Sequence, residues 1–394
     1  MIKKKRALFI INNLNVGGAE KALVSLLQLF DYNKYDVDLL LFKKEGAFLK
    51  QLPPEVCVLQ VPKNYIYFDG PFIKVFLDNL KIFRLGLILD RIRFGFLQYK
   101  NVSAAEKEQR SWRFMRHHMP ILKKNYDVAI GFLEKTPIYF CVDKVSARKK
   151  IGYIHNDYEA LGLNPLYDVQ AFKRLDSIVS VSPHCVSILK KVFPEFSEKI
   201  LLIENISSAK VIRKLALEDI NFVYKNCSIV SVGRLSPQKN FKLAVSAALI
   251  LRDRGLDFEW NIIGEGSERA EIQKLIFDFK LEGVVNLLGL RDNPYAFIKK
   301  SLIYVQPSKF EGKSIAIDEA KILLKPIVVT DFPTAKDQIV DGKNGLISEL
   351  NAESLADNIE KLINDENLRV QFTNYLAAEK VGSESEIKKL YAII

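Results

Sequence analysis

At 394 residues the chain is too long for one ordinary hydrophobic core, so its length predicts two domains. Its composition, 48% hydrophobic and 27% charged, is typical of a globular protein, and no apolar run approaches the roughly 18 residues of a transmembrane helix. The formal net charge of +11 favours acidic partners such as phosphates, anionic lipids or nucleic acid.

The first expected strand, residues 6–11, leads into a glycine loop. Its basic start and short apolar run lack a cleavage site, so they predict a strand rather than a signal peptide. The loop ends in Gly17 and Gly18, and residues 19–30 carry apolar side chains at helical spacing. A strand followed by a glycine loop and a helix predicts a phosphate-binding site at the start of the helix, although the two glycines could equally serve the packing of the helix on the strand. The loop is neither a GxGxxG fingerprint nor a Walker A loop, which disfavours a nicotinamide dehydrogenase.

Neither the acidic residues nor the cysteines predict a metal site. Asp36 and Asp38 form an Asp-Val-Asp triplet, but they lead directly into an apolar run, so we interpret them as the entry to the strand at residues 36–42. The four cysteines lie far apart without CxxC spacing. They are expected to be buried reduced thiols, which fits a reducing compartment.

Residues 68–116 interrupt the alternating pattern with a basic and aromatic segment. Ten Lys or Arg stand against four acids over residues 74–116, interleaved with phenylalanines, leucines and a tryptophan. Such a mixture on helices is typical of an interfacial membrane-binding surface. A helical insertion whose apolar stripe packs on its own sheet explains the pattern equally well. Nucleic-acid binding is disfavoured, because no nucleic-acid-binding motif accompanies these residues.

A histidine follows one of the strands of the first half. Strands are expected at residues 127–132 and 150–154, and His155 comes directly after the second. Open α/β sheets bind ligands at the carboxyl ends of their strands, so His155 is a candidate site residue, with a structural role as the equal alternative. Strands at residues 178–181 and 200–203 complete this half.

The second half alternates strands and helices more regularly. A strand at residues 228–232 precedes a loop with Arg234 and Lys239, two cations placed where a diphosphate fits. The following strands are expected at residues 258–263, 284–288, 302–308 and 326–330, and the closing helices at residues 352–364 and 366–380. This alternation predicts an α/β protein with a mostly parallel, doubly wound sheet in each half.

Two glutamates follow the strand expected at residues 302–308. Glu311 and Glu319 are eight positions apart, a spacing that puts two carboxylates about two turns apart on one helix face. Gly312 marks a loop, and we expect the helix to begin near Lys313, so that its N-terminus forms an anion site beside the carboxylates. A ligand with both phosphates and sugar hydroxyls would suit such a site, because its phosphates accept hydrogen bonds from N–H groups and its hydroxyls donate hydrogen bonds to carboxylates. An ordinary solvated helix face is the alternative.

Several motifs occur in the order in which one enzyme family carries them. They are GGAEK at 17–21, GRLSPQKN at 233–240, GEGSE at 264–268, LGLRDNP at 288–294, FEGKSIAIDEA at 310–320 and VDGKNGLI at 340–347. Together they resemble the retaining glycosyltransferases of family 4, most closely the bacterial enzymes that build capsule, O-antigen and other surface polysaccharides. The resemblance is specific over most of the second half. In the first half it depends on GGAEK and on the strand before His155.

This resemblance implies the GT-B fold, in which two Rossmann-like, doubly wound domains face each other across a cleft. Residues 1–207, including the insertion at about 68–116, would bind the acceptor, a glycan or a lipid-linked sugar. Residues 208–377 would bind a nucleotide-diphosphate sugar, expected to be UDP-linked. The last helix, residues 378–394, would return to the first domain.

The resemblance also implies roles for the matching residues. Arg234 and Lys239 are the expected diphosphate ligands, while Glu311 would bind sugar hydroxyls and Glu319 ribose hydroxyls. Backbone N–H groups would come from Gly312, Lys313 and Ser314, followed by Ile315, and the phosphates would be lined by Gly17, Gly18 and Gly264. Leu290 and Arg291 would flank the base, and His155 would lie beside the sugar. The catalytic set would be His155, Glu311, Arg234 and Lys239. No metal or other cofactor is implied.

The chemistry implied is departure of the nucleotide diphosphate through an oxocarbenium-like transition state, stabilised by the cations. No residue is an obvious covalent nucleophile, so we favour attack on the same face, with the leaving phosphate accepting the proton. One departure from the family is the Lys313-Ser314 pair, which stands where an EGFGL-like pattern is common. Lys313 would add a cation near the donor.

Two other classes stay open on the sequence. One is a nucleotide-sugar epimerase of the same fold, which would use more carboxylates and histidines in the first domain. The other is a non-catalytic membrane-surface binding protein that uses the basic helices. For either enzyme class we expect a cytoplasmic location, with peripheral attachment to the inner face of the cell membrane as a hypothesis.

Overall fold

The computed structural model describes residues 4–15, 17–69, 85–97, 99–220, 222, 227–379 and 381–394. Much of the predicted insertion (residues 70–84 and 98), part of the predicted entry to the second domain (221 and 223–226) and Lys380 of the last predicted helix lie outside the described residues. The chain divides into two units. The first holds Met1–Asn15, Leu26–Ile203 and Ile387–Ile394, and the second holds Val16–Ser25 and Glu204–Glu386.

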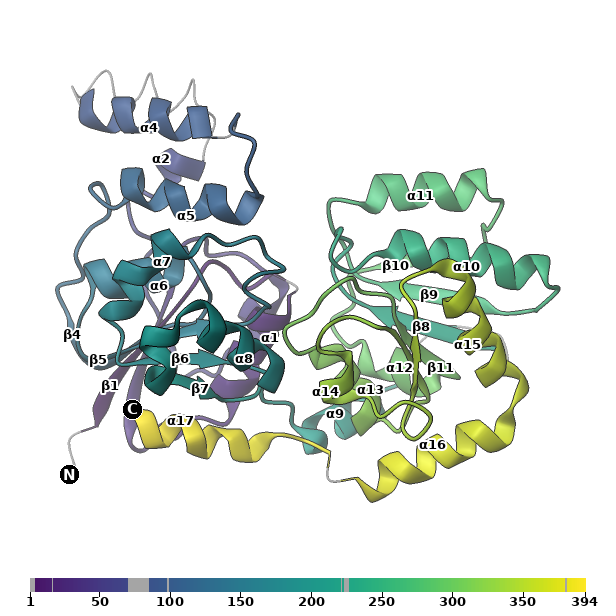
Figure 1. The fold of residues 1–394 in the computed structure, drawn as a ribbon. Helices are drawn as coiled ribbons and strands as arrows, with labels where there is room; N and C mark the ends of the chain where they lie inside the picture. Colours follow the sequence, from purple (N-terminus) through teal and green to yellow (C-terminus); the bar gives the residue numbers. More distant parts are fainter. Residues whose placement is uncertain are drawn as a thin grey trace. The chain divides into compact units, whose positions relative to one another are not determined.

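In its described part, the first unit contains a seven-stranded parallel sheet with the order β3-β2-β1-β4-β5-β6-β7. Figure 1 shows this unit with strands β1, β4, β5, β6 and β7 labelled. The strands are β1 (Lys5–Ile11), β2 (Tyr35–Leu41), β3 (Cys57–Val58), β4 (Asn125–Gly131), β5 (Ser146–Ile154), β6 (Ser177–Ser180) and β7 (Ile200–Leu202). The helices are α1 (Gly18–Gln28), α2 (Ile66–Asp69), α4 (Leu85–Leu97), α5 (Ala104–Met115), α6 (Thr136–Lys144), α7 (Pro165–Lys173), α8 (Pro183–Val192) and α17 (Ile387–Ile393), with 3-10 turns at Ala47–Gln51 and Pro194–Lys199. The first turns of α1 group with the second unit.

In its described part, the second unit contains a six-stranded parallel sheet with the order β10-β9-β8-β11-β12-β13. The strands are β8 (Ser228–Val232), β9 (Glu259–Ile263), β10 (Val285–Gly289), β11 (Ile303–Gln306), β12 (Ile327–Thr330) and β13 (Leu346–Ser348). The helices are α9 (Ala209–Leu215), α10 (Phe241–Asp253), α11 (Arg269–Asp278), α12 (Tyr295–Lys300), α13 (Ile315–Ile322), α14 (Ala335–Gln338), α15 (Ala352–Asn364) and α16 (Glu366–Ala378), with a 3-10 turn at Glu384–Glu386.

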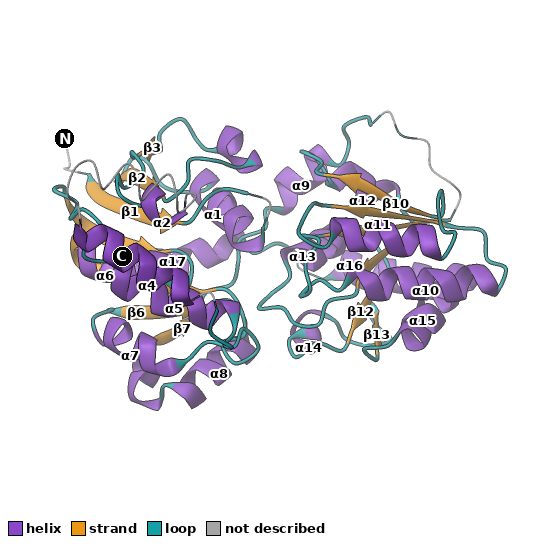
Figure 2. Ribbon diagram, turned by 90° about the horizontal axis from the view of Figure 1, so that it is seen from above, coloured by secondary structure: helices purple, strands orange, loops and turns teal. Residues whose placement is uncertain are grey.

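The second sheet is buried on both faces, which is why its strands are rich in Val, Ile and Leu. Alternate residues of β8 point to opposite sides: Ile229 belongs to a core with α10, α11 and α15, whereas Val230 belongs to a core with α12 and α13. Figure 2 shows helices on both sides of these strands. Parallel sheets with helical crossovers in both units confirm the predicted α/β class.

Some predicted bounds were wrong. The edge strands β3 and β13 were not predicted, because two or three residues give too little alternation to detect. The last helix before the C-terminal segment ends at Ala378, and α13 begins at Ile315 rather than near Lys313. The C-terminal helix α17 lies in the first unit, where the Tyr391 ring stacks on Tyr35 with 5.8 Å between centroids.

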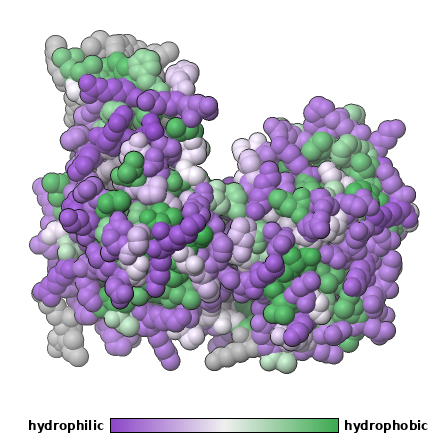
Figure 3. All heavy atoms as spheres, in the orientation of Figure 1, coloured by the Kyte–Doolittle hydropathy of each residue, from purple (hydrophilic) through white to green (hydrophobic). Residues whose placement is uncertain are grey.

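The described part of the insertion has one packed face and one exposed face. From α5, Trp112 and Met115 enter the core of the first unit, and so does Leu97 of α4; Leu87 of α4 is buried as well. On the opposite side of α4, Leu89 is 54% exposed and Phe96 is 68% exposed. Figure 3 shows hydrophobic residues at the surface in this region. Packing within the first unit therefore explains the buried apolar residues of the insertion but not the exposed ones. Within the described ranges, no helix combines the length and the apolar character that crossing a bilayer requires.

A buried carboxylate joins three helices of the first unit. Asp168 of α7 is 3% exposed and accepts hydrogen bonds from Gln109 Nε2 of α5 at 2.7 Å and from the Tyr158 hydroxyl at 2.5 Å. The Tyr139 hydroxyl of α6 donates to its other oxygen. Burial raises the pKa of Asp168 to about 6, although these three donors oppose the shift.

We expect Asp168→Asn to change how stability depends on pH. Because the folded-state pKa of Asp168 is raised, its protonated form contributes stability that is present below about pH 4 and is lost as the pH rises through about 6. A tenfold difference between the folded and unfolded acid dissociation constants corresponds to about 1.4 kcal/mol, so between pH 4 and 7 the wild type should lose roughly 2–3 kcal/mol relative to Asp168→Asn.

Urea unfolding at several pH values tests this, in a Trp260→Phe background so that Trp112 reports on the first unit. Asp36→Asn is the control, because its side chain is 58% exposed. Parallel stability curves for the wild type and Asp168→Asn would contradict the prediction.

Candidate active site

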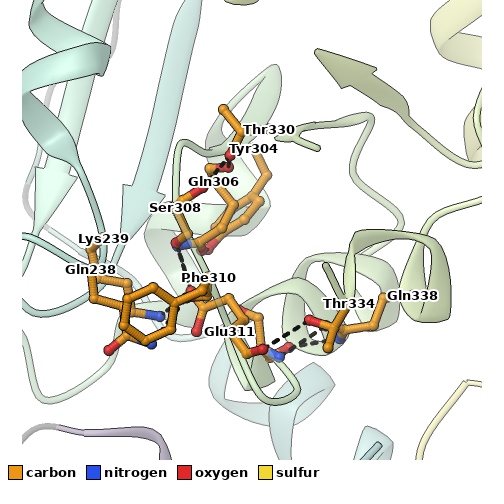
Figure 4. Close-up of polar contacts among 11 residues, drawn as sticks. Gln238, Lys239, Tyr304, Gln306, Ser308, Phe310, Glu311, Thr330, Thr334 and Gln338 are labelled. Atoms are coloured by element: carbon orange, nitrogen blue, oxygen red, sulfur yellow. Dashed lines mark hydrogen bonds and ion pairs between the residues drawn. The ribbon is translucent and has the colours of Figure 1, made fainter. Parts of the chain in front are cut away.

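Glu311 lies in the loop after β11, among side chains that converge on one of its oxygens (Figure 4). Its Oε1 accepts from Lys239 Nζ at 2.6 Å, from Ser308 Oγ at 2.6 Å and from Gln306 Nε2 at 3.4 Å. The glutamate is 5% exposed. A buried carboxylate stays ionised only where donors replace water, so this cluster holds a charged, oriented group at the end of a strand.

The two glutamates do not share a helix face, and in this respect the prediction from their spacing was wrong. Helix α13 begins at Ile315, four residues after Glu311, and only Glu319 lies on it. Glu311 is instead fixed by its loop: Thr334 Oγ1 donates to its carbonyl at 3.1 Å, and Gln238 Nε2 donates to the carbonyl of Phe310 at 3.0 Å. Loop geometry of this kind leaves no periodic pattern in the sequence.

Glu319 is enclosed by a lysine and a tyrosine. The Lys21 ammonium forms an ion pair with Oε1, and the Tyr295 hydroxyl donates to the same oxygen at 3.2 Å. Burial raises the pKa of Glu319, and Lys21 partly opposes this. Burial together with the charge of Glu319 raises the pKa of Tyr295 to about 12.

The two carboxylates lie near one phenol of β11. The Tyr304 side chain is fully buried, and its hydroxyl donates to Gln306 Oε1 at 2.6 Å. Burial raises its pKa well above the ordinary value, and the negative charges of Glu319 and Glu311 add to the shift. The structure therefore brings both predicted glutamates to the same end of β11.

Arg234 and the glycine loop lie together in the second unit. Arg234 Nη2 is 3.6 Å from Glu20 Oε1, and its side chain is 50% exposed. A Cβ built on Gly17 would lie 2.5 Å from Arg234 Nη2, so a larger residue there would displace the guanidinium. Gly18 starts α1, and a Cβ there would meet nothing within 4 Å. The first helical turn of the chain thus contributes to the region that Arg234 occupies.

Gly264 is required by a close approach of two loops. Its φ is +150°, and an added Cβ would collide with the carbonyl of Gly233. Its N–H donates to the carbonyl of Gly289 at 2.9 Å, so the ends of β8, β9 and β10 are held against one another. This packing aligns the loop that carries Arg234 and Lys239.

Lys313 and Ser314 differ from the expectation. Lys313 Nζ lies 2.6 Å from Glu204 and 3.6 Å from Asp318, so its charge is offset within the protein rather than added to the donor site. Burial alone would lower the pKa of Lys313, but these two carboxylates raise it. The Ser314 N–H donates to Gln338 Oε1 at 2.9 Å, and Gln338 Nε2 donates back to the Ser314 carbonyl at 2.8 Å. That backbone donor is therefore committed inside the protein.

Leu290 and Arg291 follow β10. Leu290 is 46% exposed, and the Arg291 guanidinium lies 5.8 Å from the centre of the Phe297 ring. A pocket of about 270 Å³ adjoins Arg291. Its lining residues are Ile220, Phe222, Arg291, Asp292, Asn293 and Phe297.

His155 lies at the carboxyl end of β5 in the first unit. It is 6% exposed, and its backbone N–H donates to Glu134 Oε2 at 3.1 Å. Its ring packs on Phe132 with 4.9 Å between centroids. Asp38, from the Asp-Val-Asp triplet, accepts from Lys124 Nζ at 2.6 Å and from the Tyr126 hydroxyl at 2.8 Å. In the part of the chain that the structure describes, no group of three or more His, Cys, Asp or Glu could hold a metal ion.

Sequence reasoning missed four residues of the site. They are Lys21, Tyr295, Gln306 and Ser308. Gln306 and Ser308 could have been noticed, because polar residues at the end of an apolar strand are unusual. Lys21 stands within GGAEK, but its partner is almost three hundred residues away in the chain, a pairing that spacing cannot indicate.

Comparison with known proteins identifies the chemistry. The family model "Glycosyl transferases group 1" matches residues 216–378, which include Arg234, Lys239, Glu311 and Glu319. Residues 216–378 are a group 1 glycosyltransferase domain. An N-acetylgalactosaminyltransferase of Campylobacter jejuni, named for the acceptor N-acetylgalactosamine-N,N'-diacetylbacillosaminyl-diphospho-undecaprenol, is 25% identical over 380 residues, which cover 94% of this chain and 93% of that protein. A poly(ribitol-phosphate) alpha-N-acetylglucosaminyltransferase of Staphylococcus aureus is 31% identical over 163 residues, 40% of this chain and 33% of its own.

Solved structures share the fold of the glycosyltransferase over nearly its whole length. A variant of TarM from S. aureus, in complex with fondaparinux, alpha-GlcNAc-glycerol and UDP, has a TM-score of 0.69 at 16% identity, with 99% of each chain covered. HepE from Anabaena, in complex with UDP and glucose, has a TM-score of 0.67 at 17% identity, with 98% of each chain covered. The predicted GT-B fold is confirmed, and neither the epimerase nor the non-catalytic alternative is favoured.

We expect Glu311→Ala to destabilise the second unit of the glycosyltransferase strongly. The Lys239 side chain is only 18% exposed, so removal of the carboxylate leaves a largely buried ammonium and a serine hydroxyl without their acceptor. Breaking a buried pair in this way costs about 3–5 kcal/mol.

Urea unfolding followed by Trp260 fluorescence measures this cost. Glu353→Ala is the matched control in the same unit, because the Glu353 side chain is 66% exposed and its pair with Arg254 should contribute less than about 1 kcal/mol. Equal losses in the two variants would show that the Glu311 cluster is not a stabilising pair.

Proposed function

We propose that this glycosyltransferase moves a sugar, with retention, from a UDP-linked donor to a glycan or lipid-linked acceptor in bacterial surface-polysaccharide synthesis. The observation that carries the proposal is the buried Glu311 carboxylate, held by Lys239 and Ser308 beside the loop of Arg234. A fixed carboxylate next to fixed cations fits a ligand that has both hydroxyls and phosphates.

Each residue takes one part of the donor. Arg234 and Lys239 bind the diphosphate, Glu311 accepts from sugar hydroxyls, and Glu319 accepts from ribose hydroxyls. The glycine loop, Gly264 and the Gly312 segment approach the phosphates; Leu290 and Arg291 flank the base; His155 lies beside the sugar. The Ser314 N–H is committed to Gln338, so it is not among the backbone donors proposed for this segment.

The residues supply charge and position rather than a nucleophile. As the bond between the anomeric carbon and the leaving oxygen breaks, negative charge grows on the diphosphate, and Arg234 and Lys239 offset it. The acceptor hydroxyl attacks the same face, and its proton passes to the departing phosphate. Lys239 also forms an ion pair with Glu311, so one ammonium contacts both the carboxylate proposed to bind the sugar and the leaving diphosphate. No metal or other cofactor is part of this proposal.

The substrate class is supported by the relatives. The Campylobacter protein is named for a diphospho-undecaprenol acceptor, and the solved TarM and HepE structures contain UDP. We therefore assign donor binding to the second unit and acceptor binding to the first. Of the closing segment, predicted as residues 378–394, only Ile387–Ile394 group with the first unit, so only these residues belong to the proposed acceptor unit.

A lipid-linked acceptor calls for contact with a membrane surface. The exposed face of α4 presents Leu85, Leu89 and Phe96, with Arg93 between them, and this combination suits the headgroup region of an anionic bilayer. We propose peripheral attachment at the inner face of the cell membrane through this helix face.

A panel of nucleotide sugars tests the donor assignment. One UDP-sugar should raise the melting temperature of the wild type and be slowly consumed, whereas Glu311→Gln and Arg234→Ala should each reduce turnover by about 10²–10³-fold, the usual effect of losing one transition-state contact. Arg252→Ala serves as the control, because Arg252 pairs with Asp253 and with the carbonyl of Phe279 rather than with a proposed site residue. If no nucleotide or nucleotide sugar binds the wild type, the site does not bind a donor.

Flotation with vesicles tests the membrane contact. The wild type should float with vesicles of anionic lipid at low salt and less so at high salt, because surface charges are screened. Replacing Leu85, Leu89 and Phe96 with Ser should abolish flotation, whereas Leu166→Ser should not, although Leu166 of α7 is 81% exposed. Absence of binding at low salt would rule out this surface.

A further inference from the structure

The first helical turn of the chain supplies the cation that neutralises Glu319. Lys21 of α1 and Glu319 of α13 lie in the second unit, and their side chains are 19% and 2% exposed. The Lys21 ammonium also lies 4.6 Å from the centre of the Tyr295 ring. Burial alone would lower the pKa of Lys21, but Glu319 and Tyr295 raise it, so this lysine stays charged throughout the physiological range.

The bonds to Glu319 are distributed unequally between its two oxygens. Both Lys21 and the Tyr295 hydroxyl interact with Oε1. The other oxygen, Oε2, is buried and has no hydrogen-bond partner among the residues that the structure describes. A buried acceptor without a donor destabilises a protein, and a charged one does so more. Such an oxygen is the kind of group that a ligand hydroxyl completes.

We propose that Lys21 is a positioning residue for nucleotide recognition: it anchors Glu319 through Oε1, so that Oε2 accepts a hydroxyl of the donor ribose. The proposal rests on the donor assignment above and adds a residue that this assignment did not contain. Because Oε2 is sealed from solvent, a neighbouring side chain must shift when the hydroxyl enters. Lys21, with its long and partly exposed side chain, can shift while its charge stays close.

Electrostatics explains why the anchor must be a cation. Burial favours the neutral carboxylic acid, and Lys21 is the first of the groups that oppose this shift at Glu319. A neutral residue at position 21 would leave a carboxyl group that holds its own proton and accepts a ribose hydroxyl poorly. The remaining donor, Tyr295, is neutral and too weak to replace the ammonium.

Binding of UDP, 2′-deoxy-UDP and 3′-deoxy-UDP tests the proposal by calorimetry on the full chain. The wild type should bind one of the deoxy forms about 10- to 100-fold more weakly than UDP, the effect expected for a hydrogen bond to a charged group. In Lys21→Met that ratio should fall to near one, through weaker binding of UDP itself. Lys21→Arg should keep the ratio.

Each result is decisive for a different statement. If Lys21→Met binds UDP and keeps the wild-type ratio, Lys21 does not position the ribose ligand, while the donor assignment stands. If the wild type does not bind UDP, the donor assignment fails and this proposal fails with it. Circular dichroism reports whether each variant folds. If Lys21→Met does not fold, Lys21→Gln is a smaller change that allows the same comparison of UDP with its deoxy forms. A merely structural lysine would weaken all three ligands equally and leave the ratio unchanged.

Discussion

Buried carboxylates at the end of one parallel sheet are the constraint on which the second unit depends. Glu311 and Glu319 are 5% and 1% exposed, and each has a cation at contact distance, because a buried charge without a partner is costly. Lys239 forms the ion pair with Glu311, and Lys21 forms the ion pair with Glu319. The same rule applies to Asp318, which Lys313 and Gln338 satisfy. Buried charge is thus kept in apolar surroundings by ion pairs within the protein.

These pairs draw on segments that are far apart in the chain. GGAEK begins at the first helix, yet its first turns group with the second unit, where Glu20 approaches Arg234 and Lys21 binds Glu319. One turn of helix therefore touches both the residue assigned to the diphosphate and the residue assigned to the ribose. This explains why a short motif at the start of the chain accompanies motifs near residue 311.

The basic and aromatic insertion shows that two interpretations of one pattern need not compete. Its apolar residues divide between faces: Trp112 and Leu97 enter the core, whereas Leu89 and Phe96 remain at the surface. Core packing accounts for the first group by the ordinary amphipathic rule. The second group, with Arg93 among them, lies on the exposed face of α4.

The sequence by itself determined the alternation of strands and helices, and hence two parallel sheets, because helical and strand periods leave clear traces in apolar residues. Its motifs predicted the glycosyltransferase domain that the family model confirms over residues 216–378, with Arg234, Lys239, Glu311 and Glu319 as the residues to examine. The tertiary structure alone decided how these residues are held. Glu311 is fixed by Lys239 and Ser308 in a loop rather than on a helix, and the Lys313 charge is paired with Glu204. The pairing of Lys21 with Glu319 arises from the fold of the whole chain, since no local pattern links residues that only tertiary packing brings together.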